Sequence, residues 1–357
     1  APAVLTAQNA GGEYNGTDYT LPQPVVSVMA DDGTYVDQTG EYRLRYRVTR
    51  ESTGDTWSFT NDLPHFTDAG VYAVEITATS RRHASPVTGT ATLTITRRPL
   101  TVTSGNNAPA PFTYSGEAQQ VDPWLVELGT FAPNDDIAAY TFADGAGNEN
   151  TDVCDRPVTL DAITLKNGSR DVTANYDITL TSGRIVIAPL YVAGGLTLTG
   201  ESHVYDGGSH SVKLGNTLVT PLGSLSLSDE TLSDGSPRFT VAYTATPYGG
   251  SEGLRGGTSP AFINVTLQMV TAYVTDLSGN LTIAPASETV EVTRRPVTIT
   301  PNSLTVPFDG MGHTVTGYAR PKAALDENGV AIGETGLVGT DDAFVTLTNN
   351  GPYTLPG

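Results

Sequence analysis

The sequence predicts an all-β fold, arranged as a tandem array of small β domains in an extended rod. Apolar residues alternate with polar ones at period two through most of the chain, and no apolar series at helical spacing lasts beyond a turn or two. Short motifs also recur at the spacing of one small β domain. Each domain is either an Ig-like sandwich or a β-grasp-like sheet, because the single helix of a β-grasp could lie near residues 120–130.

The period-two runs are bounded by Gly, Asn, Asp and Pro, which is typical of half-buried strands. In the clearest run, Tyr42, Leu44, Tyr46 and Val48 fall on one face. We expect strands of this kind at residues 42–49, 90–96, 178–181 and 290–293.

A proline-containing exit motif recurs along the chain. Thr96-Arg-Arg-Pro99 returns as Thr293-Arg-Arg-Pro296, and Ile187-Ala-Pro189 occupies the matching place between them. Proline has no N–H and fixes φ, so it marks the end of a strand and stiffens the join to the next one.

An aromatic-X-Gly turn follows the same rhythm. Its aromatic residues are spaced by 100, 91 and 103 positions, at Tyr14, Tyr114, Tyr205 and Phe308. Both motifs together predict three complete β repeats and a truncated fourth, with the boundaries 1–98, 99–189, 190–296 and 297–357.

Composition narrows the class of protein. The chain has 357 residues, with 19 basic and 38 acidic side chains and a formal charge of -19. Nucleic acid is not expected as a partner, because phosphate binding requires fields of Lys and Arg. No apolar run is long enough for membrane insertion of this segment, and Cys154 is the only cysteine, which excludes an intrachain disulfide. We expect a monomer without a cofactor.

Further motifs accompany the turn and the exit strand. Asp68-Ala-Gly-Val-Tyr72 precedes the exit strand at residues 92–99, and Asn175-Tyr-Asp-Ile stands near the end of the second repeat. Together these elements resemble the MBG/YDG-type repeats of bacterial cell-surface adhesin-like proteins. The resemblance implies a non-enzymatic, extracellular segment at the bacterial cell surface or cell wall, acting as an adhesin or stalk. It implies a host glycoprotein or glycan as partner, and it carries no catalytic residues.

Two other functions compete with this interpretation. The repeats could be passive spacers attached to an enzyme domain outside this chain. A glycan-active enzyme is a weaker alternative, because no paired-carboxylate context is visible.

The first repeat holds 8 of the 19 basic residues and supplies the candidate ligand-binding residues. Arg43, Arg45 and Arg47 alternate with the apolar face of one predicted strand, so they should lie on one side, about 6.6–6.8 Å apart. Arginine binds carboxylated and sulfated glycans in bidentate fashion. The simpler interpretation is a solvated strand face that discourages edge pairing. Trp57, with Tyr46 and Phe59, could stack on a sugar ring, although core packing is the more common role of such residues.

The sequence predicts no metal site. His203 and His210 flank the Tyr205-Asp-Gly turn and could bind a metal together with Asp206, but their spacing matches no common ligand pattern. We therefore expect both histidines to face solvent.

The acidic pairs lead to the same conclusion. Asp135-Asp136 and Asp341-Asp342 lack the spacing of a calcium loop. They occupy similar places in their repeats, which predicts a shared turn at the surface.

Overall fold

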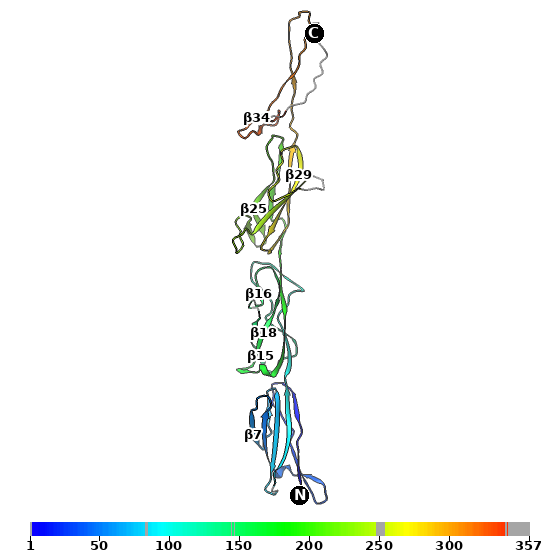
Figure 1. The fold of residues 1–357 in the computed structure, drawn as a ribbon, viewed down its shortest axis with the longest axis vertical. Coiled ribbons are helices and arrows are strands. Elements are labelled where there is room, and N and C mark those ends of the chain that lie inside the picture. Colours follow the sequence, from blue (N-terminus) through cyan, green and yellow to red (C-terminus); the bar gives the residue numbers. More distant parts are fainter. Residues whose placement is uncertain are drawn as a thin grey trace. The chain divides into compact units, whose positions relative to one another are not determined.

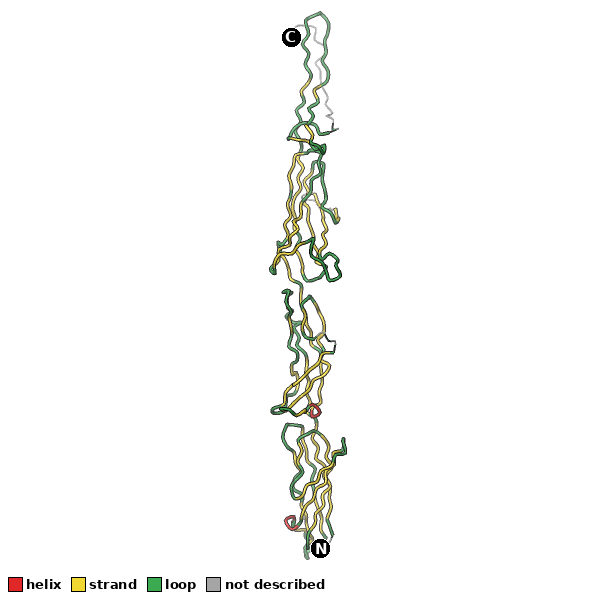
Figure 2. The backbone as a smooth tube through the Cα atoms, turned by 90° about the vertical axis from the view of Figure 1, so that its left-hand side faces the viewer, coloured by secondary structure: helices red, strands yellow, loops and turns green. Residues whose placement is uncertain are grey.

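The computed structural model describes residues 2–82, 85–143, 145, 147–247, 254–339 and 341. Within these ranges the secondary structure is β strand apart from two short 3-10 helices, η1 (Thr39–Glu41) and η2 (Thr173–Asn175) (Figure 2). None of the described helices is long and apolar enough to cross a membrane. The chain divides into two compact units, residues 1–112 with 117–188, and residues 113–116 with 189–357.

The helix considered for residues 120–130 is not there. This stretch carries the strands β13 (Gln119–Gln120) and β14 (Leu125–Leu128) instead. The β-grasp alternative is therefore wrong for this repeat, and the array is built from β-sandwich domains.

The first repeat packs a five-stranded sheet, in the order β2-β10-β9-β6-β7, with a three-stranded sheet in the order β1-β4-β5 (Figure 1). Its strands are β1 (Ala3–Thr6), β2 (Ala10–Glu13), β3 (Tyr19–Thr20), β4 (Val25–Met29), β5 (Tyr35–Asp37), β6 (Arg43–Arg50), β7 (Thr56–Thr60), β8 (His65–Phe66), β9 (Gly70–Thr79) and β10 (Val87–Thr96). Strand β2 runs parallel to β10, whereas the other pairs of the five-stranded sheet are antiparallel.

The second repeat contains three small sheets, in the orders β14-β11-β20, β12-β21-β17 and β15-β18-β19, and the pair β13-β16. Its remaining strands are β11 (Arg98–Thr103), β12 (Phe112–Thr113), β15 (Asp135–Phe142), β16 (Glu149–Asn150), β17 (Cys154–Val158), β18 (Leu160–Asn167), β19 (Arg170–Asp171), β20 (Tyr176–Thr181) and β21 (Gly183–Ala188). Strand β11 begins directly after β10, so the exit motif joins the two repeats almost without a linker.

The third repeat has the same arrangement of strands as the first. Its five-stranded sheet has the order β24-β31-β29-β27-β28, and β24 again runs parallel to its neighbour β31. Its strands are β22 (Leu190–Val192), β23 (Leu196–Thr199), β24 (Glu201–Val204), β25 (Lys213–Thr220), β26 (Gly223–Ser226), β27 (Phe239–Pro247), β28 (Leu254–Gly256), β29 (Thr266–Asp276), β30 (Leu281–Ile283) and β31 (Ala286–Thr293). Four short strands follow, namely β32 (Thr300–Pro301), β33 (Tyr318–Ala319), β34 (Ala324–Leu325) and β35 (Ala331–Ile332).

The predicted alternation of apolar and polar residues along the strands places the apolar side chains in the core. Strand β6 alternates exposed and buried residues from Arg43 to Val48, and β10 buries Leu93 and Ile95 in the same way. One continuous cluster of buried apolar residues extends from Tyr14 to Tyr176 and so includes both the first and the second repeat.

The glycine of each aromatic-X-Gly turn has a left-handed backbone conformation. The φ angles are 79° at Gly16, 77° at Gly116, 80° at Gly207 and 78° at Gly310. Only glycine adopts this conformation without steric cost, which explains why the residue recurs in the motif.

A buried ion pair closes one end of the third repeat. The Asp276 side chain is fully buried and accepts hydrogen bonds from Arg238 Nε at 3.1 Å and Nη2 at 3.3 Å. It also accepts the backbone N–H of Leu281 at 3.0 Å and thereby holds the turn between β29 and β30. Burial raises the pKa of Asp276, but the hydrogen bonds and charge of Arg238, together with Ser278, outweigh burial and leave that pKa below its ordinary value.

We predict that Asp276→Asn lowers the local free energy of unfolding by about 3–5 kcal/mol, because it removes the carboxylate nearest to the Arg238 guanidinium, whose other acidic neighbour, Glu230, is 3.8 Å away. Slower-exchanging amides of β29 should lose protection in hydrogen exchange at neutral pH. Folding lowers the pKa of Asp276. The ion pair therefore contributes its full share of the wild-type stability above the unfolded pKa of about 4, and this contribution is lost as the pH falls below that value.

Asp234→Asn is the matched control, since Asp234 lies in an exposed turn of the same repeat. Equal protection of β29 in both variants would contradict a stabilising role for the ion pair.

Candidate functional site at the junction between repeats

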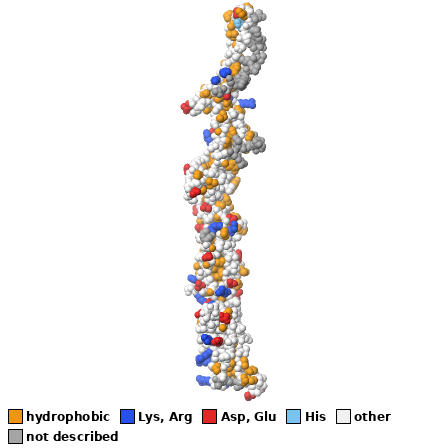
Figure 3. Space-filling model, viewed as in Figure 1, with side chains coloured by type: hydrophobic (Ala, Val, Ile, Leu, Met, Phe, Trp, Pro, Cys, Tyr) orange, Lys and Arg blue, Asp and Glu red, His pale blue; other side chains and the backbone are white. Residues whose placement is uncertain are grey.

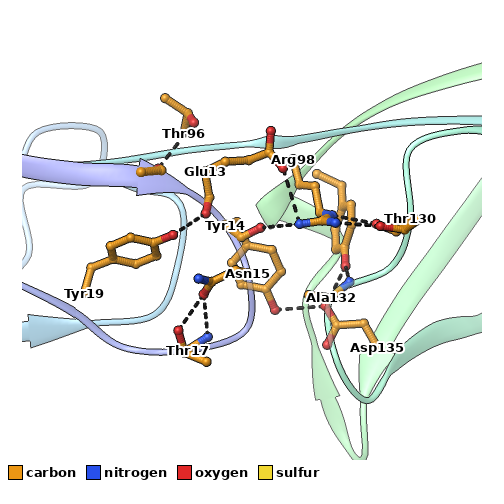
Figure 4. A network of polar contacts seen from close by, with 12 residues as sticks. Glu13, Tyr14, Asn15, Thr17, Tyr19, Thr96, Arg98, Thr130, Ala132 and Asp135 are labelled. Carbon is orange, nitrogen blue, oxygen red and sulfur yellow. Dashed lines mark hydrogen bonds and ion pairs between the residues drawn. The ribbon is translucent and has the colours of Figure 1, made fainter.

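The second arginine of the exit motif connects the first repeat to the second (Figure 4). Arg98 Nε donates to the carbonyl oxygen of Thr130, and Arg98 Nη2 donates to the Thr130 hydroxyl, each at 2.6 Å. On the other side, Nη1 donates to the carbonyl oxygen of Tyr14 at 3.3 Å and lies 3.3 Å from a carboxylate oxygen of Glu13. One guanidinium group therefore holds the aromatic turn of one repeat against a loop of the next.

The carboxylate of Asp135 forms the buried centre of the junction. Its Oδ2 accepts hydrogen bonds from the hydroxyl of Tyr14, at 3.0 Å, and from the hydroxyl of Tyr176, at 2.7 Å. Its Oδ1 accepts from Asn167 Nδ2 at 2.7 Å. Asp135 is 7% exposed, so the expectation that it is a surface turn residue is wrong. The carboxylate is retained in the interior because three donors satisfy it.

The two tyrosines are held in their protonated form. Burial, followed by the hydrogen bond and the charge of Asp135, raises the pKa of Tyr14 to about 12. Burial is also the main cause that raises the pKa of Tyr176. Their rings meet edge to face, with centroids 5.4 Å apart, so each tyrosine contributes both apolar contact and a hydroxyl donor.

A second group of contacts joins the other motifs of the two repeats. The amide oxygen of Asn175 accepts the backbone N–H of Ala69 at 2.9 Å, and Asn175 Nδ2 donates to Asp68 at 2.8 Å. Asp68 also forms an ion pair with Arg170. The Asp-Ala-Gly segment of the first repeat thus binds the Asn-Tyr segment of the second, which explains why both segments stand out in the sequence.

The other unit contains an equivalent junction after the third repeat. Arg295 Nη1 donates to the carbonyl oxygen of Tyr205 at 3.2 Å, and Arg295 Nε donates to that of Gly336 at 3.0 Å. Burial raises the pKa of Tyr205, and the charge of Asp341 and a hydrogen bond to its carboxylate raise it further. Tyr205, Arg295 and Asp341 therefore correspond to the tyrosine, arginine and carboxylate of the first junction. Asp342, the other member of that acidic pair, lies outside the described residues.

The two arginines of the exit motif have different roles. Arg97 and Arg294 are exposed, whereas Arg98 and Arg295 turn inward to the junction. The sequence marks both this motif and the acidic pairs, but it does not show that they meet in the fold. The one available signal was that each recurs in more than one repeat.

Arg43, Arg45 and Arg47 are exposed along β6, as their alternation predicts. Figure 3 shows basic side chains over the N-terminal repeat, near the edge of the sheet that carries β7. Arg45 and Arg47 line a polar depression with Ser58, Thr60 and other neighbours, and Arg47 lies 3.8 Å from Glu75. This face presents guanidinium groups to solvent, which an anionic ligand requires.

Trp57 does not belong to that face. It pairs with the buried Val48 in the β6–β7 register and points to the core side of the sheet. Its ring meets Phe66 edge to face at 4.9 Å and lies 6.1 Å from Tyr72. The structure therefore separates Trp57 from the arginines and packs it among aromatic side chains.

One group of described residues has the composition of a metal site. Glu201, His203 and His210 bring one ligand atom each to within 4.8 Å of one another. His210 is 8% exposed, so the expectation that both histidines face solvent is wrong for this residue. Asp206, the third ligand considered from the sequence, instead contacts the far nitrogen of His210.

Comparison with known proteins gives only distant structural similarity. No protein-family model matches the chain, and no curated protein sequence does. Among solved structures, three N-terminal domains of the bacteriophage RB49 Highly Immunogenic Outer Capsid protein are 13% identical, with a TM-score of 0.24, covering 82% of this chain and 98% of that one. Domains A168–A170 of titin are 16% identical, with a TM-score of 0.21 and coverages of 82% and 99%. The FN1–FN3 domains of chicken CNTN1 are 10% identical, with a TM-score of 0.18 and coverages of 80% and 99%. Similarity at these levels carries no argument about function.

We predict that Asp135→Ala lowers the local free energy of unfolding at the first junction by about 2–4 kcal/mol, because two buried hydroxyl groups lose their acceptor. Hydrogen exchange of the full chain should show lost protection in β15, in β18 and at the amide of Ala132, which donates to Tyr176. Asp136→Ala is the control, because Asp136 is exposed beside it. Similar exchange in both variants would show that the buried carboxylate does not hold the junction.

Proposed function

We propose that this chain is a non-enzymatic segment of an extracellular bacterial surface protein, of the MBG/YDG type that its sequence resembles. In this role it is a stalk or adhesin segment at the cell surface or cell wall, and it acts as a monomer. Its repeats hold a binding surface away from the surface that carries them.

The single observation that supports this proposal most is the junction that occurs in both units. A stalk requires consecutive domains that do not swing freely, and a flexible linker cannot supply this. Arg98 and Arg295 each connect the aromatic turn of a repeat to the chain beyond the exit proline. Because these bonds involve a charged donor and lie at partly buried positions, they are stronger than ordinary surface contacts.

The exposed arginine face distinguishes an adhesin from a passive spacer attached to an enzyme outside this chain. Arg43, Arg45 and Arg47 stand on one face of β6, although the chain as a whole is acidic. Their guanidinium groups suit carboxylate or sulfate groups of a host glycan or glycoprotein. Display of several such chains would raise avidity over a weak single site.

Small-angle X-ray scattering tests the stalk role. A compact globule of this length has a radius of gyration of about 20–21 Å, whereas four domains in line should give well above about 30 Å. We expect the larger value for the wild type. Arg98→Ala/Arg295→Ala should reduce the maximum dimension, because both junctions then bend more freely.

Arg97→Ala/Arg294→Ala is the matched control, since it removes the exposed arginine of each exit motif. A wild-type value near that of the globule would overturn the stalk proposal. Equal dimensions in both double variants would show that the inward arginines do not stiffen the chain.

An array of sulfated and carboxylated glycans tests the adhesin role. We expect wild-type binding that Arg43→Ser/Arg45→Ser/Arg47→Ser abolishes, because the variant removes every proposed contact to the anionic group. Arg97→Ser/Arg294→Ser, which removes exposed arginines elsewhere, should leave binding intact. No binding by the wild type, or unchanged binding by the triple variant, would remove the arginine-face hypothesis and leave the passive spacer.

A further inference from the structure

A histidine–carboxylate cluster lies on the third repeat, apart from the arginine face. Glu201 Oε2 is 3.5 Å from His203 Nε2 and 3.8 Å from His210 Nδ1. The two imidazole rings are stacked, with centroids 3.9 Å apart. Three possible ligand atoms of two chemical types therefore lie within 4.8 Å of one another.

The fold fixes these three side chains from two directions. Glu201 and His203 are two residues apart on β24, so they project from the same side of the strand. His210 follows the Tyr205-Asp-Gly turn, and its backbone exchanges hydrogen bonds of 2.9 and 2.8 Å with Phe262. Backbone pairing therefore places these three residues beside one another.

Neighbouring groups orient the cluster as they do in known metal sites. His210 Nε2 is 3.0 Å from Asp206 Oδ1, which directs the other ring nitrogen, Nδ1, to Glu201. Metal-binding histidines commonly donate their second N–H to a carboxylate in this way. Lys213 Nζ lies 2.8 Å from Glu201 Oε1, which leaves Oε2 directed to the histidines.

The other repeats show that this cluster is particular to the third. Counting from the aromatic residue of each turn, Glu201, His203 and His210 occupy the positions -4, -2 and +5. The first repeat has Ala10, Gly12 and Tyr19 there, the second has Ala110, Phe112 and Gln119, and the fourth has Leu304, Val306 and His313. In the fourth repeat, His313 keeps its contact to Asp309, at 2.8 Å, without the other two groups. The histidine–aspartate pair thus belongs to the turn, whereas the complete set of three ligand atoms does not follow from the repeat.

We propose that Glu201 Oε2, His203 Nε2 and His210 Nδ1 bind one Zn²⁺ ion. Two imidazoles and one carboxylate are a known ligand set for zinc, which completes its tetrahedron with a water molecule. Ligand bonds of about 2.0–2.2 Å place tetrahedral donors about 3.3 Å apart, close to the two separations from Glu201. Rotation of the His203 ring, whose side chain is 41% exposed, closes the remaining distance and leaves the fourth position open to solvent.

Zinc bound here would tie β24 to the aromatic turn of the same repeat. The carbonyl oxygen of Asp206 in that turn accepts the backbone N–H of Ala331 at 2.9 Å. The ion would therefore stabilise the segment from which the third repeat contacts the chain after residue 296. This inference concerns the cluster alone and does not rest on the proposed stalk role.

Isothermal titration calorimetry of the metal-free full chain with ZnCl₂ tests the proposal. We expect one specific site and a rise in the thermal unfolding midpoint with Zn²⁺ concentration, because an ion that binds only the folded state stabilises it. Co²⁺ in place of Zn²⁺ should give the absorption bands of a tetrahedral site. Ca²⁺ should not occupy the site, because it prefers oxygen ligands.

Variants decide whether these three residues form the site. His203→Ala and Glu201→Gln should each weaken binding by more than about tenfold. Both positions are at least partly exposed, and a circular dichroism spectrum equal to that of the wild type confirms that each variant is folded. His313→Ala, which removes the equivalent histidine of the fourth repeat, is the matched control and should bind zinc like the wild type.

Three results would overturn the proposal. The first is the absence of a specific site in the wild type. The second is binding that neither His203→Ala nor Glu201→Gln changes, which would place the ion elsewhere on the acidic surface. The third is a loss of binding in His313→Ala equal to that in His203→Ala.

Discussion

The arrangement of the first two repeats depends on one buried carboxylate. Asp135 accepts hydrogen bonds from two tyrosine hydroxyls that come from different repeats, Tyr14 and Tyr176. A carboxylate without donors would not remain in this apolar environment, so it requires both tyrosines in place. The polar contacts give the junction a defined geometry, and the aromatic rings supply the apolar area. Because Tyr14 and Tyr176 both belong to the continuous core of the unit, the junction and the two domain cores are stabilised together.

The motifs that mark the repeats are explained by this junction and by the strands that lead into it. The glycine of the aromatic turn permits its left-handed backbone, and the proline of the first exit motif is the second residue of β11, where its fixed φ stiffens the join to the next repeat. The second arginine then binds the turn from the side of the next repeat. At the corresponding place after the second repeat the sequence has Ala188, which has no such donor. The exit motif after the second repeat therefore differs in sequence from the other two.

The third repeat shares its strand arrangement with the first repeat but differs from it in the side chains beside the aromatic turn. Its five-stranded sheet has the strand order of the first repeat, including the parallel pairing of β24 with β31. A shared backbone plan allows three side chains to be exchanged without loss of the fold. Glu201, His203 and His210 occupy positions at which the first two repeats have no carboxylate and no imidazole. Differences of this kind between repeats indicate function more clearly than the features that all repeats share.

Local patterns in the sequence determined the all-β class and the strands, because period-two alternation and turn glycines act within a few residues. The alternation of Arg43, Arg45 and Arg47 along one exposed face was predictable for the same reason. Only the tertiary structure decided which residues are buried at the junction and which meet across it. Asp135 and Tyr14 are 121 positions apart, and the sheet register places Trp57 on the core side and brings Glu201 to the histidines. Local sequence patterns cannot predict these contacts, because they arise from the pairing of strands far apart in the chain.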